Sequence, residues 1–460
     1  MYQHYLSLPN TKVHIDANEP QGAHEWWRHS IGHGGINNSP LPEKVVQGAR
    51  LLKPRLLRTF IQEFFDFYPD HGVFDWSKLD PYMDALHRTG ADVVGCITFK
   101  PPVLYPVIDQ AIWRPASVEE WQTVIYELVR RYSVERKIVT YWEIGNETDI
   151  GEWGGCPYLI KEAEDYLEYY NFTKEPILRA FPEARIGGPA IASFEDPLLF
   201  DFIDLCHRTG TRLDFVSWHL YHDDPDRHKE LVLRAKERLA QFGGTRPEML
   251  VTEWSKSFDP VSIEELAMMP RRAAATAAAL LAMTEAGLDW SFYYHVWDQA
   301  VFPEQFESFY KDPSIMTVHW NEIPHRFGLF GVAEEIRPQY FVYRMYVRMG
   351  ETLVKAGADD PDIRVCAVTG EDKLSVMLVN YNVSASSDRV ATVHIDSLTP
   401  GRKRLLVYRI DEQRMWDEER MELLPCERRD LGTLEDGKYR FQVYCPADSV
   451  TFVTLQDAAQ

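Results

Sequence analysis

The chain has 460 residues, 45% of them hydrophobic, so it can bury one large core and a second, smaller one. Its formal net charge of −21 argues against nucleic acid and anionic membrane as partners, because a phosphate-binding face needs clustered Lys and Arg. Its six cysteines are scattered without a CxxC pair, which disfavours a zinc or disulfide framework and favours reduced thiols. No basic region followed by an apolar run opens the sequence, so we expect no signal peptide and a cytoplasmic protein.

Residues 1–27 form an N-terminal segment with one strand-like run, at residues 12–16, which could pair with strands at the far end of the chain. From residue 28 to 350, short apolar runs alternate with helical segments, which predicts an α/β fold, a (β/α)8 TIM barrel. A doubly wound open sheet is the alternative, disfavoured because no glycine-rich phosphate loop follows an early strand. The eight strands are expected within residues 27–34, 56–60, 92–99, 138–147, 184–189, 215–221, 249–253 and 290–297.

Capping residues mark the starts of several helices between these strands. Ser117 opens a capping box, and apolar residues then recur with helical spacing. Asp224 is a predicted N-cap, with Pro225 at the first helical position. The most apolar segment, residues 273–283, is short and alanine-rich, which predicts a buried helix and not a membrane span.

After residue 350 the sequence changes character. Short alternating runs are separated by polar turns, and helical periodicity is absent. Residues 351–460 are therefore predicted to form an all-β accessory domain, a β-sandwich that packs rigidly on the barrel. Its strands are expected within residues 363–368, 374–381, 391–395, 404–410, 439–444 and 450–455.

Two of the predicted barrel strands each end on a glutamate, Glu147 and Glu253. Barrels of this kind place their chemistry at the carboxyl ends of the strands, and two carboxylates are the minimum for cleaving a glycosidic bond. Glu147 is thus the candidate general acid and Glu253 the candidate nucleophile. Two alternatives stay open, a helix cap or surface ion pair for Glu147 and a strand-end salt bridge for Glu253. Retention of configuration needs carboxyl groups about 5–5.5 Å apart, whereas inversion needs about 6.5–9.5 Å.

Four polar residues near these glutamates are candidates for binding or orienting a substrate. Asn146 could bind a sugar hydroxyl, or cap a helix. Arg58, among apolar neighbours, could hold Glu253 ionised, or form a structural ion pair. His219 and Tyr221 alternate along one strand and therefore share a face, where they could contact sugar and nucleophile or belong to the core.

Further candidates for substrate binding follow the last predicted strand. Trp297 could stack on the apolar face of a sugar and Asp298 could bind hydroxyls, with core packing and helix capping as the alternatives. His33 and Phe327 complete the predicted substrate-binding set. No metal site is expected, because His29 and His33 lack the HxH spacing of barrel metallohydrolases. His219, His222, Asp223 and Asp224 form a denser cluster, but loop solvation and helix capping explain the last three of them more simply.

In these residues the chain resembles clan A glycoside hydrolases, most closely family 39, which contains β-xylosidases and α-L-iduronidases. The similarity covers the barrel and the order of its parts. The stretches that carry it are residues 142–147 (WEIGNE), 215–221 (FVSWHLY), 250–254 (LVTEW), 293–302, 324–329 (PHRFGL) and 72–76 (GVFDW). The chain departs from the family where Gly145 and Thr148 flank Asn146-Glu147 in place of Trp and Pro. It also has Phe60 where the family often has a sugar-contacting His, which leaves the identity of the bound sugar open.

The resemblance implies a retaining two-step mechanism without a cofactor. Glu147 would be the acid/base and Glu253 the nucleophile, and the orienting or binding residues would be Asn146, Arg58, His219 and Tyr221. We expect an exo-glycosidase acting on short oligosaccharides or other glycosides, with β-xylosides as the first choice. α-L-Arabinosidase, β-glucosidase or β-galactosidase and α-L-iduronidase-like activities are the alternatives, as are a non-catalytic carbohydrate-binding barrel and a metal-dependent hydrolase. Whether the protein is a homo-oligomer stays open.

Overall fold

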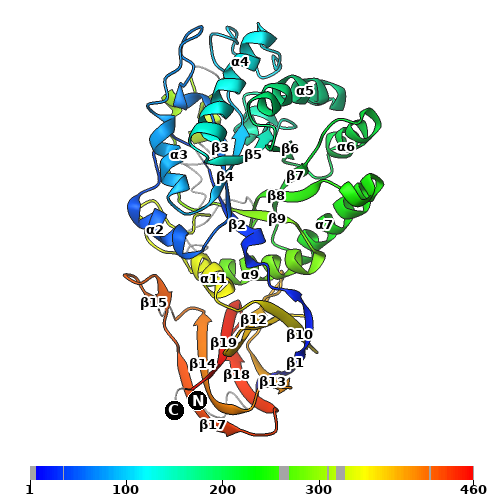
Figure 1. Ribbon diagram of the computed structural model, residues 1–460. Coiled ribbons are helices and arrows are strands. Elements are labelled where there is room, and N and C mark those ends of the chain that lie inside the picture. The colour runs from blue at the N-terminus through cyan, green and yellow to red at the C-terminus, as the bar shows by residue number, and fades with distance from the viewer. Residues whose placement is uncertain are drawn as a thin grey trace.

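The computed structural model describes residues 7–34, 36–257, 269–307, 310–317, 327–413 and 416–458. It has two parts, a barrel of strands and helices and a module of strands beside it, and both marked chain ends lie at the module (Figure 1). The first six residues, on which the expectation about a signal peptide depends, lie outside the described ranges. Residues 324–326, which belong to one of the family-like stretches, also lie outside them.

Eight parallel strands form a closed barrel in chain order, with the last strand pairing back onto the first. Each lies at one of the eight predicted runs, so the TIM-barrel prediction is confirmed. The strands are β2 (His29–His33), β3 (Leu56–Ile61), β4 (Asp92–Ile97), β5 (Val139–Ile144), β6 (Arg185–Ile191), β7 (Phe215–Tyr221), β8 (Glu248–Ser255) and β9 (Trp290–Tyr294). Three of them, β2, β3 and β9, are buried at every position, and the other five at most positions, as expected for parallel strands covered by helices.

Two helices of the barrel part, which begin at Val118 and Pro225, start where the sequence places their caps. Ser117 Oγ accepts from the Glu120 N–H at 3.2 Å, and Asp224 Oδ1 accepts from the Asp226 N–H at 2.9 Å, which confirms both predicted N-caps. The helices are α2 (Glu43–Leu51), α3 (Leu79–His87), α4 (Val118–Val129), α5 (Ala163–Ala180), α6 (Pro197–Thr209), α7 (Pro225–Leu239), α9 (Met269–Ala286), α10 (Ser314–Thr317) and α11 (Pro338–Val347). Short helical turns are η1 (Trp26–Arg28), η2 (Glu63–Phe65), η3 (Arg130–Glu135), η4 (Gly151–Gly154), η5 (Ala240–Thr245) and η6 (Pro303–Gln305). Within the described ranges, none of the helices has both the length and the apolar character needed to cross a bilayer.

The module contains one nine-stranded sheet in the order β17-β14-β19-β12-β11-β10-β1-β13-β18. The N-terminal strand β1 pairs antiparallel with β10 and parallel with β13, so the start of the chain lies in the module. Strands from both ends of the sheet bury residues in one core, including Val13, Val407 and Phe441, because the sheet folds back on itself as in a sandwich. The boundaries at residues 27 and 350 stay a prediction. The strands are β1 (Asn10–Ala23), β10 (Thr352–Ala358), β11 (Ile363–Thr369), β12 (Lys373–Asn380), β13 (Arg389–Asp396), β14 (Gly401–Ile410), β17 (Glu427–Leu434), β18 (Tyr439–Cys445) and β19 (Ser449–Asp457), with a separate pair β15 (Trp416–Asp417) and β16 (Glu422–Leu423).

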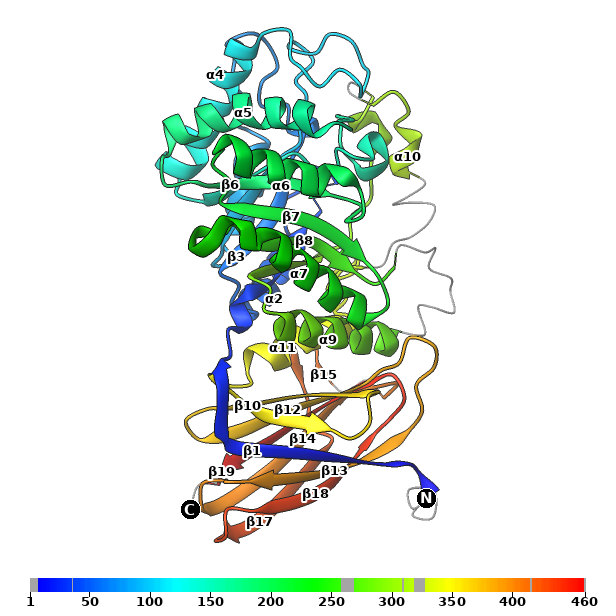
Figure 2. The ribbon, with the colours of Figure 1, turned by 90° about the vertical axis from the view of Figure 1, so that its right-hand side faces the viewer.

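Helices α9 and α11 lie between the barrel and the module (Figure 2). Strand β12 is buried on both faces, since Val376 belongs to the core of the module and Met377 to the large core that includes the helices. The Arg271 guanidinium at the start of α9 pairs with Asp448 at 2.7 Å and reaches the Val383 carbonyl at the same distance. Apolar burial and an ion pair thus hold the two parts together.

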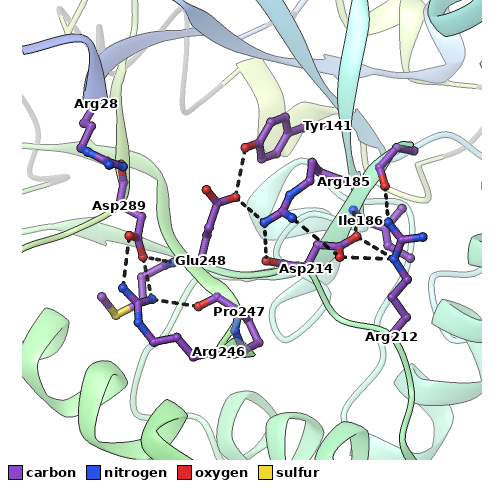
Figure 3. A network of polar contacts seen from close by, with 12 residues as sticks. Arg28, Tyr141, Arg185, Ile186, Arg212, Asp214, Arg246, Pro247, Glu248 and Asp289 are labelled. Carbon is purple, nitrogen blue, oxygen red and sulfur yellow. Dashed lines mark hydrogen bonds and ion pairs between the residues drawn. The ribbon is translucent and has the colours of Figure 1, made fainter. Parts of the chain in front are cut away.

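Charged residues at the amino-terminal ends of the barrel strands pair with one another (Figure 3). Glu248, the first residue of β8, accepts from the Tyr141 hydroxyl at 3.0 Å and from Arg185 at 2.8 Å. Arg246 donates to Asp289 at 2.8 Å. These ion pairs and hydrogen bonds stabilise the barrel at its amino-terminal face, where residues of this fold usually serve stability and not catalysis. Above them an apolar layer fills the barrel interior with Leu56, Val94, Phe215, Leu250 and Phe292.

Candidate active site

Strand alternation in β3 places Arg58 inside the barrel. Leu56 and Phe60 belong to the interior clusters, whereas Leu57 and Ile61 pack outward in the core under the helices. Arg58 lies between Leu56 and Phe60 on the inner face and is 1% exposed. A charge in this position must be paired, because an isolated buried charge is costly.

The Arg58 guanidinium connects three polar side chains at the carboxyl end of the barrel. Nη1 donates to Glu253 Oε1 at 2.5 Å, and Nη2 donates to Asn146 Oδ1 at 2.7 Å. Nε donates to Glu143 Oε2 at 2.7 Å. Arg58 therefore carries one positive charge against two carboxylates, and it fixes the position of Glu253 from behind.

A β-bulge in β8 decides the direction of Glu253. Trp218 pairs with Val251, but the next residue of β7, His219, pairs with Glu253, so Thr252 is an extra residue in β8. Val251 packs outward, and strict alternation would send Glu253 outward as well. The extra residue turns Glu253 inward, which is how bulges re-aim side chains at active sites.

A tight turn after β5 positions Glu147. Gly145 has φ 89° and Glu147 has φ 46°, and the Glu147 N–H donates to the Ala190 carbonyl at 2.8 Å. A left-handed backbone at a non-glycine residue is strained and persists only where the surroundings hold it. Gly154 lies so close that a Cβ there would come within 2.1 Å of Glu147 Oε2. Asn146 helps to hold Gly154 close to Glu147, because its Nδ2 donates to the Gly154 carbonyl at 3.1 Å.

Each glutamate has its own partner on the inner face of β7. His219 Nδ1 lies 2.6 Å from Glu147 Oε1, and the Tyr221 hydroxyl donates to Glu253 Oε2 at 2.5 Å. Single side-chain ligand atoms of Glu147, His219 and Glu253 all lie within 4.8 Å of one another. The two glutamates therefore converge on one point at the barrel mouth.

The surroundings make the two carboxyl groups chemically different. Burial raises the pKa of Glu147 well above its usual range, and the negative charge of Glu253 raises it further. Burial also raises the pKa of Glu253, but Arg58 and the Tyr221 hydroxyl act in the opposite direction. Burial lowers the pKa of His219 well below its usual range, so the imidazole beside Glu147 is neutral. The surroundings therefore favour a proton on Glu147 more strongly than on Glu253, whose charged form Arg58 and Tyr221 stabilise.

Both glutamates line one pocket of about 520 Å³, counted to its open mouth. Its walls come from several barrel loops and carry aromatic and aliphatic side chains around the two acids. The lining residues are Gly34, Ile36, Phe60, Gln62, Glu147, Trp153, Gly154, Gly155, Tyr221, Glu253, Tyr294 and Met316.

The other predicted binding residues support the site from behind or beside it. The Asp298 carboxylate pairs with Arg337 at 2.5 Å and accepts from the Gly328 N–H at 2.8 Å, so a sugar hydroxyl would have to displace a protein contact. Trp297 is half-buried and stacks on His33, with ring centroids 6.3 Å apart.

Phe327 is fully buried and packs against the Tyr221 ring at 5.9 Å. Its position supports the tyrosine that contacts Glu253. Direct sugar contacts of Trp297, Asp298, His33 and Phe327 stay a prediction.

Glu147, His219 and Glu253 also form a set of ligand types that could hold a metal ion. Protein partners already engage each of them, and the Arg58 guanidinium bonded to Glu253 would repel a cation placed there. The arrangement is better suited to proton transfer and nucleophilic attack than to metal binding.

The sequence model of glycosyl hydrolases family 39 matches residues 59–419. The chain belongs to this family. It is 25% identical over 388 residues to a β-xylosidase of Caldicellulosiruptor saccharolyticus, a match that covers 76% of this chain and 74% of that protein. It is 29% identical to human α-L-iduronidase over 119 residues, which are 22% of this chain and 18% of the other. Among solved structures it is similar to a monomeric β-xylosidase from Caulobacter crescentus CB15, with a TM-score of 0.75, 19% identity and coverage of 97% of this chain and 100% of that one.

The resemblance to family 39 and the assignment as a glycoside hydrolase are thereby confirmed. Glu143, Trp153 and Tyr294 are among the residues at this site that were not assigned from the sequence. Glu143 lies two residues after the inward-facing Tyr141, so strand alternation could have found it. Trp153 lies in a loop turn, and Tyr294 ends β9, where no local pattern indicates a pocket.

Proposed function

We propose that the protein is a retaining exo-glycosidase whose preferred substrates are β-xylosides. The observation that carries this proposal is the convergence of Glu147 and Glu253, with ligand atoms within 4.8 Å, in one pocket. So short a separation supports direct attack by a carboxylate, because an inverting enzyme keeps its carboxyl groups about 6.5–9.5 Å apart to admit a water.

In the first step, Glu253 attacks the anomeric carbon, and a bond from its oxygen forms as the bond to the leaving group breaks. Glu147 donates its proton to the departing oxygen, so the leaving group departs as a neutral alcohol. In the second step, Glu147 takes a proton from water, the water oxygen bonds to the anomeric carbon, and Glu253 departs as a carboxylate. The electrostatic difference between the two acids suits these roles, since one must be protonated and the other ionised.

A neutral terminal sugar fits the pocket better than a uronic acid. Among the described residues that line it, there are two glutamates and no Lys or Arg. The nearby Arg58 is already held by Glu253, Glu143 and Asn146. A sugar carboxylate would be desolvated beside two acids without a partner, which is unfavourable. This supports a xyloside over an iduronide, in agreement with the β-xylosidases that the chain resembles.

A screen of aryl glycosides that differ only in the sugar, combined with two variants, tests the proposal. Glu253→Ala is expected to abolish turnover. Added azide is expected to restore activity and to give a glycosyl azide of inverted configuration. Glu147→Ala is expected to retain activity on good leaving groups, lose it on poor ones, and give an azide product of retained configuration. If both variants hydrolysed aryl glycosides at the wild-type rate, the mechanism would be wrong. If the screen selected another sugar, the preference for xylose would be wrong.

A further inference from the structure

The rim of the pocket carries an exposed apolar surface on the side of the acid Glu147. Trp153 lines the pocket and is 63% exposed, which is unusual for so large an apolar side chain in the described part of the chain. It directly precedes Gly154, whose backbone lies against the Glu147 carboxyl group. Because the general acid protonates the leaving oxygen, side chains beside its carboxyl group border the leaving group.

A second loop extends this surface. Val107, Ile108 and Ile112, in the segment between β4 and α4, are 57%, 41% and 39% exposed. Ile150, at the start of the turn that holds Trp153, is 37% exposed. Both segments follow the carboxyl ends of barrel strands, so topology places them at the mouth. Of the thirteen large apolar side chains exposed in the described ranges, five lie on these two short segments.

Polar contacts join the two segments into one unit. Gln110, between Ile108 and Ile112, accepts from the Glu152 N–H at 2.9 Å, and Glu152 directly precedes Trp153. The Lys100 ammonium is buried and donates to the Asp109 carbonyl at 2.7 Å and to the Pro157 carbonyl at 3.4 Å. The apolar side chains are therefore presented on a fixed platform, which we call the rim platform (Val107, Ile108, Ile112, Ile150 and Trp153).

We propose that the rim platform binds the leaving group of the substrate, and that this group is an apolar alcohol or phenol and not a second sugar. The proposal rests on the proposed function of the same pocket. A sugar residue is recognised by aromatic faces and by polar groups placed for its hydroxyls. Trp153 offers an aromatic face beside the pocket, but the other four platform side chains are aliphatic and offer neither an aromatic face nor a polar group. Exposed apolar patches of this kind mark binding sites, and the platform reaches the catalytic pocket through Trp153, which lines it.

The test uses a series of alkyl glycosides, from methyl to octyl, of the sugar that the aryl screen selects. The leaving alcohols have nearly equal acidity, so differences in kcat/KM report binding of the chain and not chemistry. For the wild type we expect kcat/KM to rise about three- to fourfold for each methylene that the platform buries. Ile108→Ser and Ile112→Ser are expected to flatten this rise, and each variant is compared with its own value on the methyl glycoside.

A matched control is Leu424→Ser, which removes a side chain of similar exposure, 44%, in the module. It is expected to leave the dependence on chain length unchanged. The proposal would be overturned if kcat/KM of the wild type did not depend on the length of the alkyl chain. It would also be overturned if Ile108→Ser reduced kcat/KM on a disaccharide as much as on the octyl glycoside. Sedimentation showing a wild-type dimer that Ile108→Ser dissociates would assign the platform to a second copy of the chain instead. A wild type inactive on every glycoside would refute the proposed function itself, which is a distinguishable result.

Discussion

Replacement of Tyr221 by Phe isolates the electrostatic control of the nucleophile. The Tyr221 hydroxyl donates to Glu253 Oε2 at 2.5 Å, while its ring packs in an apolar cluster that Phe would preserve. A hydrogen bond to a charged group contributes about 1.5–3 kcal/mol, and one pKa unit corresponds to about 1.36 kcal/mol. Without the hydroxyl, the pKa of Glu253 is therefore expected to rise by about one to two units.

The sign of the effect on activity follows from the role of Glu253. The nucleophile must be ionised, so kcat/KM falls as pH drops through the pKa of Glu253. Burial already raises that pKa, and Tyr221 opposes the rise. The acidic limb of the pH profile of Tyr221→Phe is thus expected at higher pH than in the wild type. A dinitrophenyl glycoside is the suitable substrate, because its leaving group needs little help from Glu147.

The matched control is Tyr340→Phe, which removes a buried tyrosine hydroxyl that donates to the Gly48 carbonyl at 3.0 Å, away from the pocket residues. It is expected to lower stability without moving the acidic limb. An acidic limb of Tyr221→Phe that coincides with the wild-type limb would refute the reasoning, because Glu253 would then be ionised without the hydroxyl.

Three further outcomes are expected. Arg58→Met leaves Glu143 and Glu253 buried without their cation, so urea denaturation should show a loss of about 3–5 kcal/mol in the free energy of unfolding; an unchanged midpoint would contradict the pairing. Gly154→Ala places a Cβ against Glu147 Oε2, so kcat/KM for substrates with poor leaving groups should fall by up to about 100-fold. The control Gly244→Ala should leave kcat/KM unchanged, because a Cβ at that position meets no atom within 4 Å. Dialysis against a chelator should leave the rate of hydrolysis unchanged, because the two carboxyl groups supply the acid and the nucleophile. If the rate fell and zinc or another divalent ion restored it, a metal-dependent reaction would be favoured.

Much of the barrel could be predicted from the sequence because its signals are local. Apolar runs of strand length alternate with capped helices, and β/α order leaves few closed arrangements for eight parallel strands. The same reasoning located Glu147 and Glu253, since the carboxyl ends of parallel strands meet on one face. Alternation along a strand placed His219 and Tyr221 on one face, and Arg58 was singled out because a charge among apolar neighbours must be paired.

Other features of the site depend on long-range packing, and no local pattern predicts them. The inward direction of Glu253 depends on a register shift between β7 and β8, which arises only when the strands pair around a closed barrel. Arg58 meets Glu143 as well as Glu253, so it is shared between two acids and not dedicated to the nucleophile. His219, expected to contact the sugar, lies against Glu147.

The sequence by itself determined the order of the elements and the family, and it singled out the two candidate acids, because these follow from residue type and spacing along the chain. The electrostatic difference between the two acids depends on the tertiary structure, since burial and the neighbours of each carboxyl group are set by residues distant in sequence. It also decided that Trp153 stands at the pocket mouth, beside a loop some forty residues earlier in the chain, to which Gln110 ties it. A loop residue has no periodicity, so its surroundings depend on contacts that exist only in the folded chain.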